Sequence, residues 1–362
     1  MLKAYKYRIY PNEEQKLYLA KTFGCTRFIY NKMLSDRIKS YEENKNLDIK
    51  QIKYPTPAQY KKEFEWLKEV DSLALANAQL NLDKAYKNFF RDKSVGFPKF
   101  KSKKSNRFNF TTNNQNGTVY IENNKIKLPK LKSMIKIKQH RQFTGKIKSC
   151  TVSQVPSGKY YISILVDCES IQLPKCDKKV GIDLGLKEFA ITSDGEFFSN
   201  PKWLRKSEKR LKKLQKDLSR KQKGSNNRKK ARLKVAKLHE KIANQRKDFL
   251  HKLSSYIINE NQVIVIEDLK VKNMQQNHKL AKAISEVSWF EFRRMLEYKA
   301  NWYNRQLIIA PSNYASSQLC SNCGNKSSQT KDLSCRNYIC PVCGMIMDRD
   351  INASKNLLKL AM

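Results

Sequence analysis

Four cysteines late in the chain have the type and spacing of a metal site. Cys320 and Cys323 form one Cys-x-x-Cys pair, and Cys340 and Cys343 form a second pair after sixteen intervening residues. Cysteine thiolates are ligands that Zn²⁺ prefers, and two such pairs complete a closed four-coordinate site. We therefore predict a structural zinc ribbon, in which the metal stabilises the fold and performs no chemistry. Cys335 could replace one ligand, although it has no partner at this spacing.

Three carboxylates share a second kind of setting, at the end of an apolar strand or the start of a helix. Asp183 lies in Val-Gly-Ile-Asp-Leu-Gly, Glu267 follows Val-Ile-Val-Ile, and Asp350 opens a helical run. If their strands are neighbours in one sheet, the carboxylates converge and can hold two Mg²⁺ ions roughly 4 Å apart, as phosphodiester hydrolysis requires. We predict these three as catalytic residues and magnesium ligands. Asp268 and Asp348 remain alternatives to their neighbours.

The charge of the chain points to a polyanionic partner. The 362 residues include 73 Lys and Arg against 33 Asp and Glu, a net charge of +40. The excess extends through almost every segment, which favours a large nucleic-acid footprint. An anionic membrane surface is the weaker rival, and no apolar stretch approaches the roughly 20 residues of a spanning helix.

The start of the chain and its cysteines indicate a reducing compartment. Residues 1–10 lack the apolar stretch of a secretory signal. Nine cysteines, an odd number that includes two tight pairs, do not resemble a disulfide framework. We expect a cytoplasmic location.

The elements that must position these residues fall into two halves. In the first half, residues 5–10 alternate as a short strand, with Tyr5, Tyr7 and Ile9 on one face. A helical region follows to about Arg91, and short strands then run to about residue 167. The simplest account is a small β domain with a helical domain inserted after its first strand.

The second half alternates strands and helices. Strands are expected at 180–183, 189–198, 262–266 and 307–310, and helices over 204–253 and 287–306. A seven-residue rhythm of apolar residues, broken at residues 224–227, predicts that the first helical stretch is a hairpin. Lys and Arg are the most frequent residues at its other positions. We expect these exposed basic faces to suit contact with a phosphate backbone. Gly181 and Gly185 leave room for close backbone approach beside Asp183.

Several of these segments together resemble one family. GIDLGLKEFAITSDG from Gly181, VIVIEDL from Val263, the two Cys-x-x-Cys-Gly pairs and DRDINASKN from Asp348 occur in that order. The chain resembles TnpB, also called OrfB, a transposon-encoded family similar in its nuclease half to the type V CRISPR effectors. The opening YKYRIYPNEEQKLYLAKTFGCTRFIYN and the SGKYYISI hairpin extend the resemblance over most of the chain. Ser354, where a second Ala is usual, is a small departure.

The resemblance implies an α+β multidomain fold and its site residues. Its parts would be a β-barrel wedge domain (residues 1–10 and 96–173), a helical recognition domain (11–95), an RNase H-like RuvC nuclease domain (174–317 and 346–362) and an inserted zinc ribbon (318–345). The family's catalytic triad falls on Asp183, Glu267 and Asp350. Its zinc ligands fall on the four paired cysteines.

The resemblance also implies partners and an activity. It implies a guide RNA from the transposon end, and cleavage of double-stranded target DNA beside a short transposon-associated motif, inside a bacterial or archaeal cell at the nucleoid. A monomer is favoured. Asn77 and Gln79 could read adenines in the major groove, although surface amides are the more ordinary interpretation of either one.

Three other functions remain as alternatives. A nuclease-inactive RNA-guided repressor should have lost a carboxylate, yet all three are present. A transposase or strand-transfer accessory protein of the same fold usually orders its carboxylates Asp, Asp, Glu, whereas the order here is Asp, Glu, Asp. A bare zinc-ribbon RNA-binding protein would leave the Gly-Ile-Asp-Leu-Gly strand unexplained.

Overall fold

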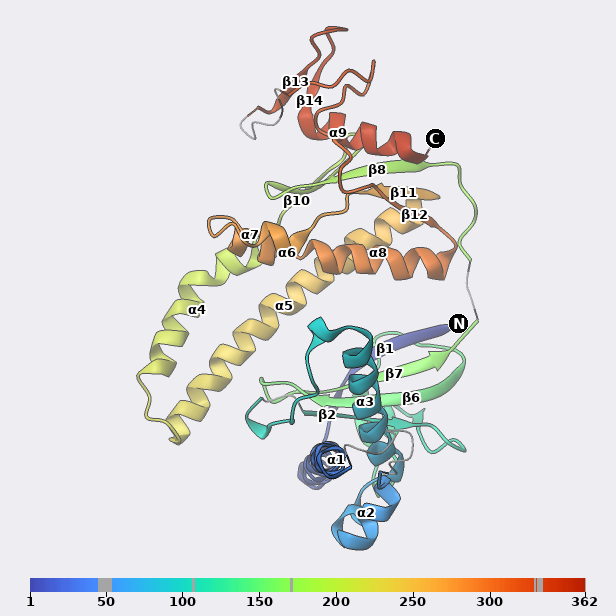
Figure 1. The fold of residues 1–362 in the computed structure, drawn as a ribbon, viewed down its shortest axis with the longest axis vertical. Coiled ribbons are helices and arrows are strands. Elements are labelled where there is room, and N and C mark those ends of the chain that lie inside the picture. The colour runs from blue at the N-terminus through green and yellow to red at the C-terminus, as the bar shows by residue number, and fades with distance from the viewer. Residues whose placement is uncertain (45–53, 106–107, 170–171, 329, 331–334, 362) are drawn as a thin grey trace. The chain divides into compact units, whose positions relative to one another are not determined.

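The computed structural model describes residues 1–44, 54–105, 108–169, 172–328, 330 and 335–361 (Figure 1). Helices and strands are mixed throughout, so the expected α+β class is confirmed. The chain divides into two compact units, Met1–Glu169 and Ser170–Met362. None of the helices within the described ranges is long and apolar enough to cross a membrane.

Unit 1 is built on a seven-stranded antiparallel sheet with the strand order β2-β6-β7-β1-β5-β4-β3. Its strands are β1 (Leu2–Tyr10), β2 (Phe108–Asn113), β3 (Tyr120–Glu122), β4 (Lys125–Lys127), β5 (Ile135–Lys138), β6 (Lys146–Gln154) and β7 (Tyr160–Asp167). In β1 the alternation buries Tyr7 and Ile9, which confirms the predicted face. The sequence prediction did not include β2.

Helices occupy the connection between β1 and β2. They are α1 (Glu13–Glu43), α2 (Pro57–Glu63) and α3 (Ser72–Arg91), with a short 3₁₀ turn at Glu65–Glu69. Asn12 caps α1 in a capping box with Gln15. Asp71 caps α3 and also accepts a hydrogen bond from the Thr112 hydroxyl of β2. The expected order of strand, helices and strands is therefore confirmed, and Asp71 ties the inserted helices to the sheet.

Unit 2 is built on a five-stranded sheet with the order β10-β9-β8-β11-β12. Its strands are β8 (Lys179–Leu184), β9 (Glu188–Thr192), β10 (Phe197–Ser199), β11 (Val263–Ile266) and β12 (Gln306–Ile309). β8, β11 and β12 run parallel, β9 pairs antiparallel with β8, and β10 pairs antiparallel with β9. The four strand segments that the sequence predicted in this half are thus present.

Helices cover both faces of this sheet, as Figure 1 shows. On one face α5 (Asn226–Glu260) and α8 (Trp289–Tyr303) pack under Ile264 and Ile266. On the other face α9 (Arg349–Leu358) contributes Leu357, which packs with Val265. Since alternate residues of β11 point to opposite faces, all four of its residues are buried. α6 (Val271–Met274) and α7 (Ala281–Val287) precede α8, which begins two residues later than the sequence suggested.

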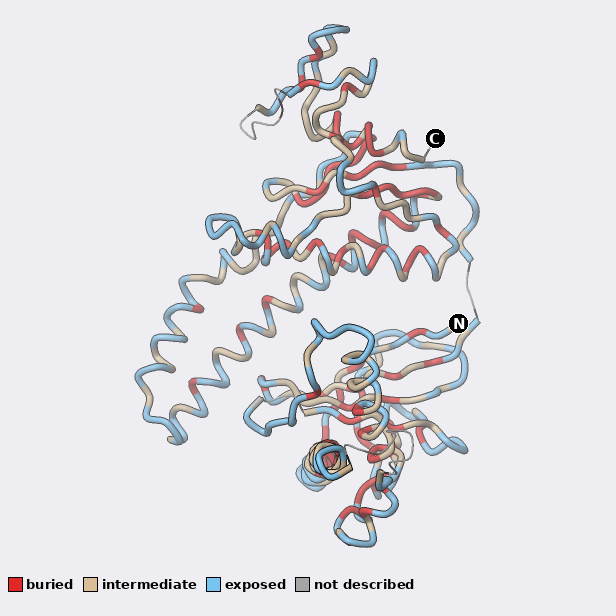
Figure 2. Tube along the Cα trace, viewed as in Figure 1, coloured by how far each residue is buried: buried red, intermediate tan, exposed pale blue. Residues whose placement is uncertain are grey.

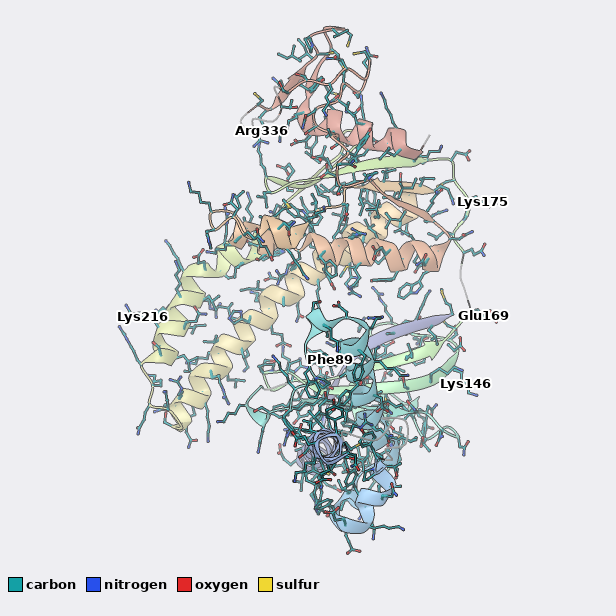
Figure 3. All side chains as sticks on the ribbon, in the orientation of Figure 1. Phe89, Lys146, Glu169, Lys175, Lys216 and Arg336 are labelled. Carbon is teal, nitrogen blue, oxygen red and sulfur yellow. The ribbon has the colours of Figure 1, made fainter. Side chains whose placement is uncertain are left out.

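α4 (Trp203–Ser219) and α5 form the predicted helical hairpin. Leu211, Leu238 and Ile242 are buried in its seam. Figure 2 shows that most of α4 is otherwise exposed. Lys216, for example, extends from α4 into solvent (Figure 3). The hairpin therefore has one apolar contact line and broad basic surfaces.

Candidate functional site

Two of the three predicted carboxylates lie at the same edge of the unit 2 sheet. β8 and β11 are parallel neighbours, and Ile182 pairs with Ile266 in their register. Asp183 follows Ile182 within β8, and Glu267 follows Ile266 directly after β11, so the two occupy equivalent places near the carboxyl ends. The expectation that their strands are neighbours is confirmed. This edge is where open α/β sheets place their ligands.

The third carboxylate reaches this edge because α9 packs against β8 at very close range. A Cβ on Gly181 would lie 2.0 Å from the carbonyl oxygen of Ser354 and 2.6 Å from the backbone nitrogen of Leu358. Only glycine permits this approach. Asp350 lies in the first turn of α9 and is near enough to Asp183 to influence its ionisation.

The carboxylates repel one another in the absence of a cation. Burial raises the pKa of Asp183 well above its usual range, and the nearby charges of Glu267 and Asp350 raise it further. Ser316 Oγ donates to Glu267 Oε1 at 3.0 Å, and Arg349 Nε donates to Asp350 Oδ1 at 3.2 Å. Their oxygen atoms do not all lie within 4.8 Å of one another, so among the described residues the three carboxylates are neighbours and not a closed ligand set. Carboxylate oxygens are the ligands that Mg²⁺ prefers.

The two alternative carboxylates have other partners. Asp268 pairs with Arg293 of α8. Asp348 caps α9, because its Oδ1 accepts from the backbone N–H groups of Asp350 at 2.9 Å and Ile351 at 3.1 Å. Glu267 and Asp350 are the carboxylates whose charges raise the pKa of Asp183.

The four paired cysteines form a compact cluster. Their Sγ atoms all lie within 4.8 Å of one another, and among the described residues this is the only group of three or more Cys, His, Asp or Glu side chains so close. Sγ of Cys320 is 3.6 Å from that of Cys343, and Sγ of Cys323 is 3.5 Å from that of Cys340. A tetrahedral site with Zn–S bonds of about 2.3 Å has S···S edges of about 3.8 Å. The cluster could therefore bind zinc, and Cys335 lies outside it.

The two cysteine pairs adopt nearly the same backbone conformation. In each turn the second cysteine N–H donates to the first Sγ at 3.5 Å, and a glycine with positive φ follows. Donation by the backbone N–H of Met345 lowers the pKa of Cys343 to about 6, which favours the thiolate that a metal needs. β13 (Asn337–Ile339) and β14 (Ile346–Asp348) pair on either side of the second turn, and β14 leads directly into α9.

Two buried amides join the cysteine region to α9, and the sequence analysis did not identify them. Asn352 accepts from the Ser321 N–H at 2.9 Å and donates to the Leu319 carbonyl at 2.7 Å. Asn356 donates to the carbonyls of Leu319 at 2.6 Å and Ser316 at 2.8 Å. We call Asn352 and Asn356 the amide clasp. Their spacing of four residues on a buried helix face was the available signal.

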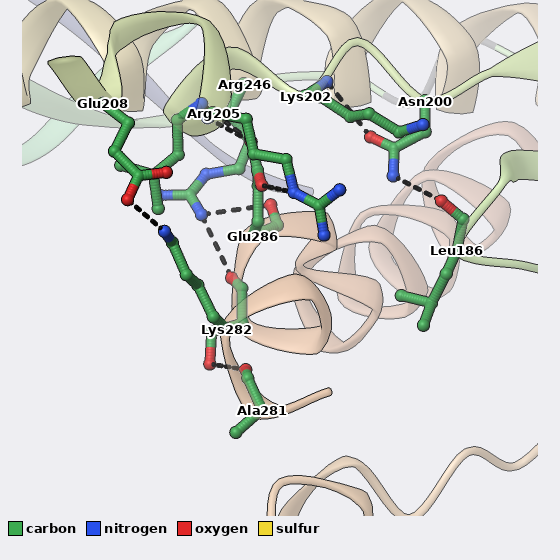
Figure 4. A network of polar contacts seen from close by, with 11 residues as sticks. Leu186, Asn200, Lys202, Arg205, Glu208, Arg246, Ala281, Lys282 and Glu286 are labelled. Carbon is green, nitrogen blue, oxygen red and sulfur yellow. Dashed lines mark hydrogen bonds and ion pairs between the residues drawn. The ribbon is translucent and has the colours of Figure 1, made fainter. Parts of the chain in front are cut away.

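The base of the basic hairpin is also fixed by side chains. Glu286 of α7 accepts hydrogen bonds from the backbone N–H groups of Leu204, at 2.7 Å, and Arg205, at 3.2 Å (Figure 4). It thereby caps α4, whose own N-cap residue, Lys202, has φ of 49° and no capping side chain. Arg246 of α5 donates to the Glu286 carbonyl at 3.2 Å. These hydrogen bonds hold the start of α4 and the middle of α5 against α7, so the base of the hairpin is fixed within unit 2.

Asn77 and Gln79, suggested as base readers, lie differently on α3. Asn77 lines a cavity of about 490 Å³ with Asn81, Arg27 and Asn109, whereas Gln79 is not among its lining residues. Nδ2 of Asn77 already donates to the Leu73 carbonyl at 2.8 Å, which leaves its Oδ1 available. The structure thus keeps one of the two amides at a concave polar surface.

Sequence comparisons cover most of the chain. Three family profiles match: one described as "Probable transposase" (OrfB of IS605) over residues 163–278, a Cas12f1-like TNB domain over 289–357, and a helix-turn-helix domain over 1–46. Over the last of these ranges the structure has β1 and the single long helix α1.

Two curated relatives extend over almost the full length. A protein of Streptomyces pristinaespiralis named "Putative RNA-guided DNA endonuclease" is 40% identical over 98% of this chain and 88% of its own length. The Escherichia coli K12 protein named "Putative RNA-guided DNA endonuclease InsQ" is 35% identical over 99% of this chain and 92% of its own. Among solved structures, Cas12f1 in a complex with sgRNA and target DNA matches with a TM-score of 0.63 at 13% identity, over 99% of this chain and 98% of that one. The last match concerns the fold alone.

Proposed function

The chain belongs to the TnpB (OrfB) family of transposon-encoded proteins, and from this premise we propose that it is an RNA-guided DNA endonuclease of a transposable element. The observation that carries the proposal is the approach of Asp183, Glu267 and Asp350 to one edge of a sheet. Relatives that bear this activity in their names match this chain over nearly its full length.

In the proposed mechanism Asp183, Glu267 and Asp350 hold Mg²⁺. When bound, the metal supplies an activated water and stabilises the oxygen that leaves the phosphodiester. Asp183 offers a carboxylate whose pKa is raised by burial and by its acidic neighbours, and a bound cation would favour its ionised form. Ser316 orients Glu267 through a 3.0 Å hydrogen bond, and Arg349 lies against Asp350.

The proposed domains are those implied by the family. Residues 174–317 and 346–362 form a RuvC nuclease domain, interrupted by a zinc ribbon at 318–345. Residues 1–10 and 96–173 form a wedge domain, and 11–95 form a recognition domain. Zn²⁺ is held by the cysteine cluster, whose sulfur–sulfur distances and closed ligand set fit a structural ion.

The proposed partners are a guide RNA from the transposon end and double-stranded target DNA. Base pairing by the guide would read the sequence, and the protein would supply a basic channel and recognise a short adjacent motif. The net charge of +40 supports such extensive contact with phosphates. The protein would work as a monomer in the bacterial or archaeal cytoplasm, at the nucleoid.

The test begins with expression of the protein together with its native downstream DNA, followed by sequencing of the RNA that co-purifies. We expect one abundant RNA that maps to the end of the element. The complex is then given Mg²⁺ and DNA carrying a sequence complementary to the 3′ end of that RNA, and cleavage is measured. Heterogeneous cellular RNA, or none, would point instead to a guide-independent nuclease or a transposition factor.

Asp183→Ala provides the decisive variant. We expect loss of at least about 10³-fold in cleavage rate, since a metal ligand contributes several kcal/mol to the transition state, while RNA and DNA binding are retained. Asp194→Ala is the matched control, because Asp194 is a carboxylate of the turn between β9 and β10 that pairs with Lys178 at 3.0 Å and accepts from Ser193 Oγ at 3.4 Å. Cleavage by Asp183→Ala near the wild-type rate would refute the triad.

A further inference from the structure

Four aromatic side chains gather where α3 ends. Tyr86, Phe89 and Phe90 come from its last turns, and Phe97 comes from the segment that follows. Ring centroids of Phe89 and Phe97 are 5.4 Å apart at an interplanar angle of 82°, and those of Tyr86 and Phe97 are 5.6 Å apart at 88°. Tyr86 and Phe90 stack at 6.2 Å. We call these four residues the α3 aromatic cluster; Figure 3 labels Phe89 within it.

This cluster is not part of a hydrophobic core. The side chain of Phe90 is 64% exposed and that of Phe97 is 44% exposed. Of the four, only Tyr86 packs partly against the buried core of the helical insertion. Aromatic rings fixed edge to face by their neighbours present a preformed apolar surface with little rotamer entropy left to lose.

The surroundings of the cluster are strongly basic. Residues 84–104 contain eight basic residues and one acidic residue, Asp92. The basic residues are Lys84, Lys87, Arg91, Lys93, Lys99, Lys101, Lys103 and Lys104. Nζ of Lys93 lies 4.3 Å from the ring centroid of Phe89, over its face. Such charge opposes the burial of this surface against a basic or neutral protein partner and favours a polyanion.

The loop that carries Phe97 is held in place. The backbone N–H of Lys101 donates to Asn31 Oδ1 at 2.7 Å, and Asn31 Nδ2 donates to the Lys101 carbonyl at 2.9 Å. Nζ of Lys101 lies 3.8 Å from the ring centroid of Tyr30. Both ends of the segment from Arg91 to Lys101 are therefore anchored, and the rings are presented on a firm support.

We propose that the α3 aromatic cluster is a stacking platform for unpaired bases of the RNA that the protein binds. Exposed rings beside lysines are the combination that binds single-stranded nucleic acid, since bases stack on the rings and phosphates meet the cations. The RNA partner is taken from the proposed function. RNA is the source favoured here because a guide strand carries unpaired bases from the start, whereas target DNA remains paired until it is opened.

The experiment uses the full chain and an oligouridine RNA of roughly 15 nucleotides. The strand carries a fluorescent base analogue whose emission falls on stacking, and salt is raised so that phosphate contacts contribute less. For the double variant Phe90→Ala/Phe97→Ala we expect about tenfold weaker binding and loss of the emission change. Tyr41→Ala is the matched control, because Tyr41 is an aromatic of α1 with 52% exposure.

Two single variants separate stacking from apolar contact. Phe90→Tyr keeps an aromatic face and should bind like the wild type, whereas Phe90→Leu keeps apolar area without that face and should behave like Phe90→Ala. Melting temperatures of all variants are compared, and the exposed position of Phe90 predicts that they stay near the wild-type value.

Four results would overturn the proposal. The first two are unchanged RNA binding by the double variant and wild-type RNA binding by Phe90→Leu. The third is an equal loss of affinity for oligothymidine DNA and for RNA in the double variant. The fourth is ultraviolet crosslinking of this segment to protein and not to RNA. Mapping of RNA crosslinks to the end of α3 would support it. Because no cleavage is measured, a negative result leaves the nuclease proposal standing.

Discussion

The cysteine cluster and the carboxylate cluster are assembled in opposite ways. Each cysteine pair lies within one turn, and the two turns are built alike, so four sulfur atoms come within 4.8 Å of one another. The carboxylates come from three elements far apart in sequence, which are neighbours because β8 pairs with β11 and α9 packs on β8. Local backbone geometry determines the first site, and tertiary packing determines the second.

This difference predicts which substitutions should disrupt each site. A local site depends mainly on its own ligands, whereas a site assembled from distant segments is sensitive to any change that shifts one of them. The amide clasp joins the two, because Asn352 of α9 bonds both Leu319 and Ser321 beside the first cysteine pair. Three substitutions test the comparison, in order of decreasing effect.

The largest effect is expected from Cys340→Ser. Loss of one thiolate should reduce zinc content from about one ion per chain to nearly none and unfold the ribbon, since metal binding supplies much of the folding energy of such modules. Cleavage should fall as well, because α9 loses its anchor. Metal analysis and thermal melting provide the measurement, with Cys335→Ser as the control that keeps its zinc. Wild-type metal content and melting in Cys340→Ser would argue against the ribbon.

Gly181→Ala should damage the carboxylate site and leave the cysteine site intact. The added methyl group would lie 2.0 Å from the Ser354 carbonyl oxygen, so α9 must move. We expect a loss of about 1–3 kcal/mol in unfolding free energy and a melting temperature lower by about 3–10 °C. Cleavage should fall sharply with unchanged zinc content.

The control for that substitution is Gly24→Ala, since a Cβ at Gly24 meets no atom within 4 Å. It should melt at or slightly above the wild-type temperature because alanine favours a helix. Full cleavage by Gly181→Ala would mean that the position of α9 does not govern the carboxylates.

Asn352→Ala should have the smallest effect on cleavage and report on the link between the sites. It leaves the Ser321 N–H without its partner, at a cost of about 1–3 kcal/mol. Zinc should remain bound but be removed faster by a chelator, and cleavage should weaken partially. Asn352→Asp keeps the acceptor for Ser321 and loses the donor to Leu319, so it should be intermediate. If a chelator removes zinc from both variants at the wild-type rate, the amide clasp does not couple the cysteine site to the carboxylate site.

The sequence predicted the local features of this molecule well. The cysteine turns follow from spacing, the α4–α5 hairpin from its apolar rhythm, and the parallel neighbours β8 and β11 from the need of two carboxylates to meet. Strand β2 escaped prediction although Phe110 and Thr112 alternate as buried residues, because no turn signal marks its start. α7 and α8 are separated at Ser288, whose φ is 62°. Serine rarely adopts a positive φ, so the sequence did not indicate this helix break.

Partners supplied by tertiary structure were the least predictable part. Nothing in the sequence indicates that Glu286 caps the distant helix α4 or that Asn352 reaches the cysteine turns. Both side chains look like ordinary polar residues of a helix. Their roles depend on which element lies opposite, and that is decided by the packing of the whole unit.

The position of α9 after the cysteine turns has a consequence during synthesis. A ribosome makes Asp183 and Glu267 well before Asp350, and domains fold in the order in which they emerge. The basic hairpin can therefore form while the third carboxylate is still missing. Under the proposed function, a nascent or stalled chain could hold nucleic acid but not cut it, so the order of translation itself would delay the nuclease until α9 has been made.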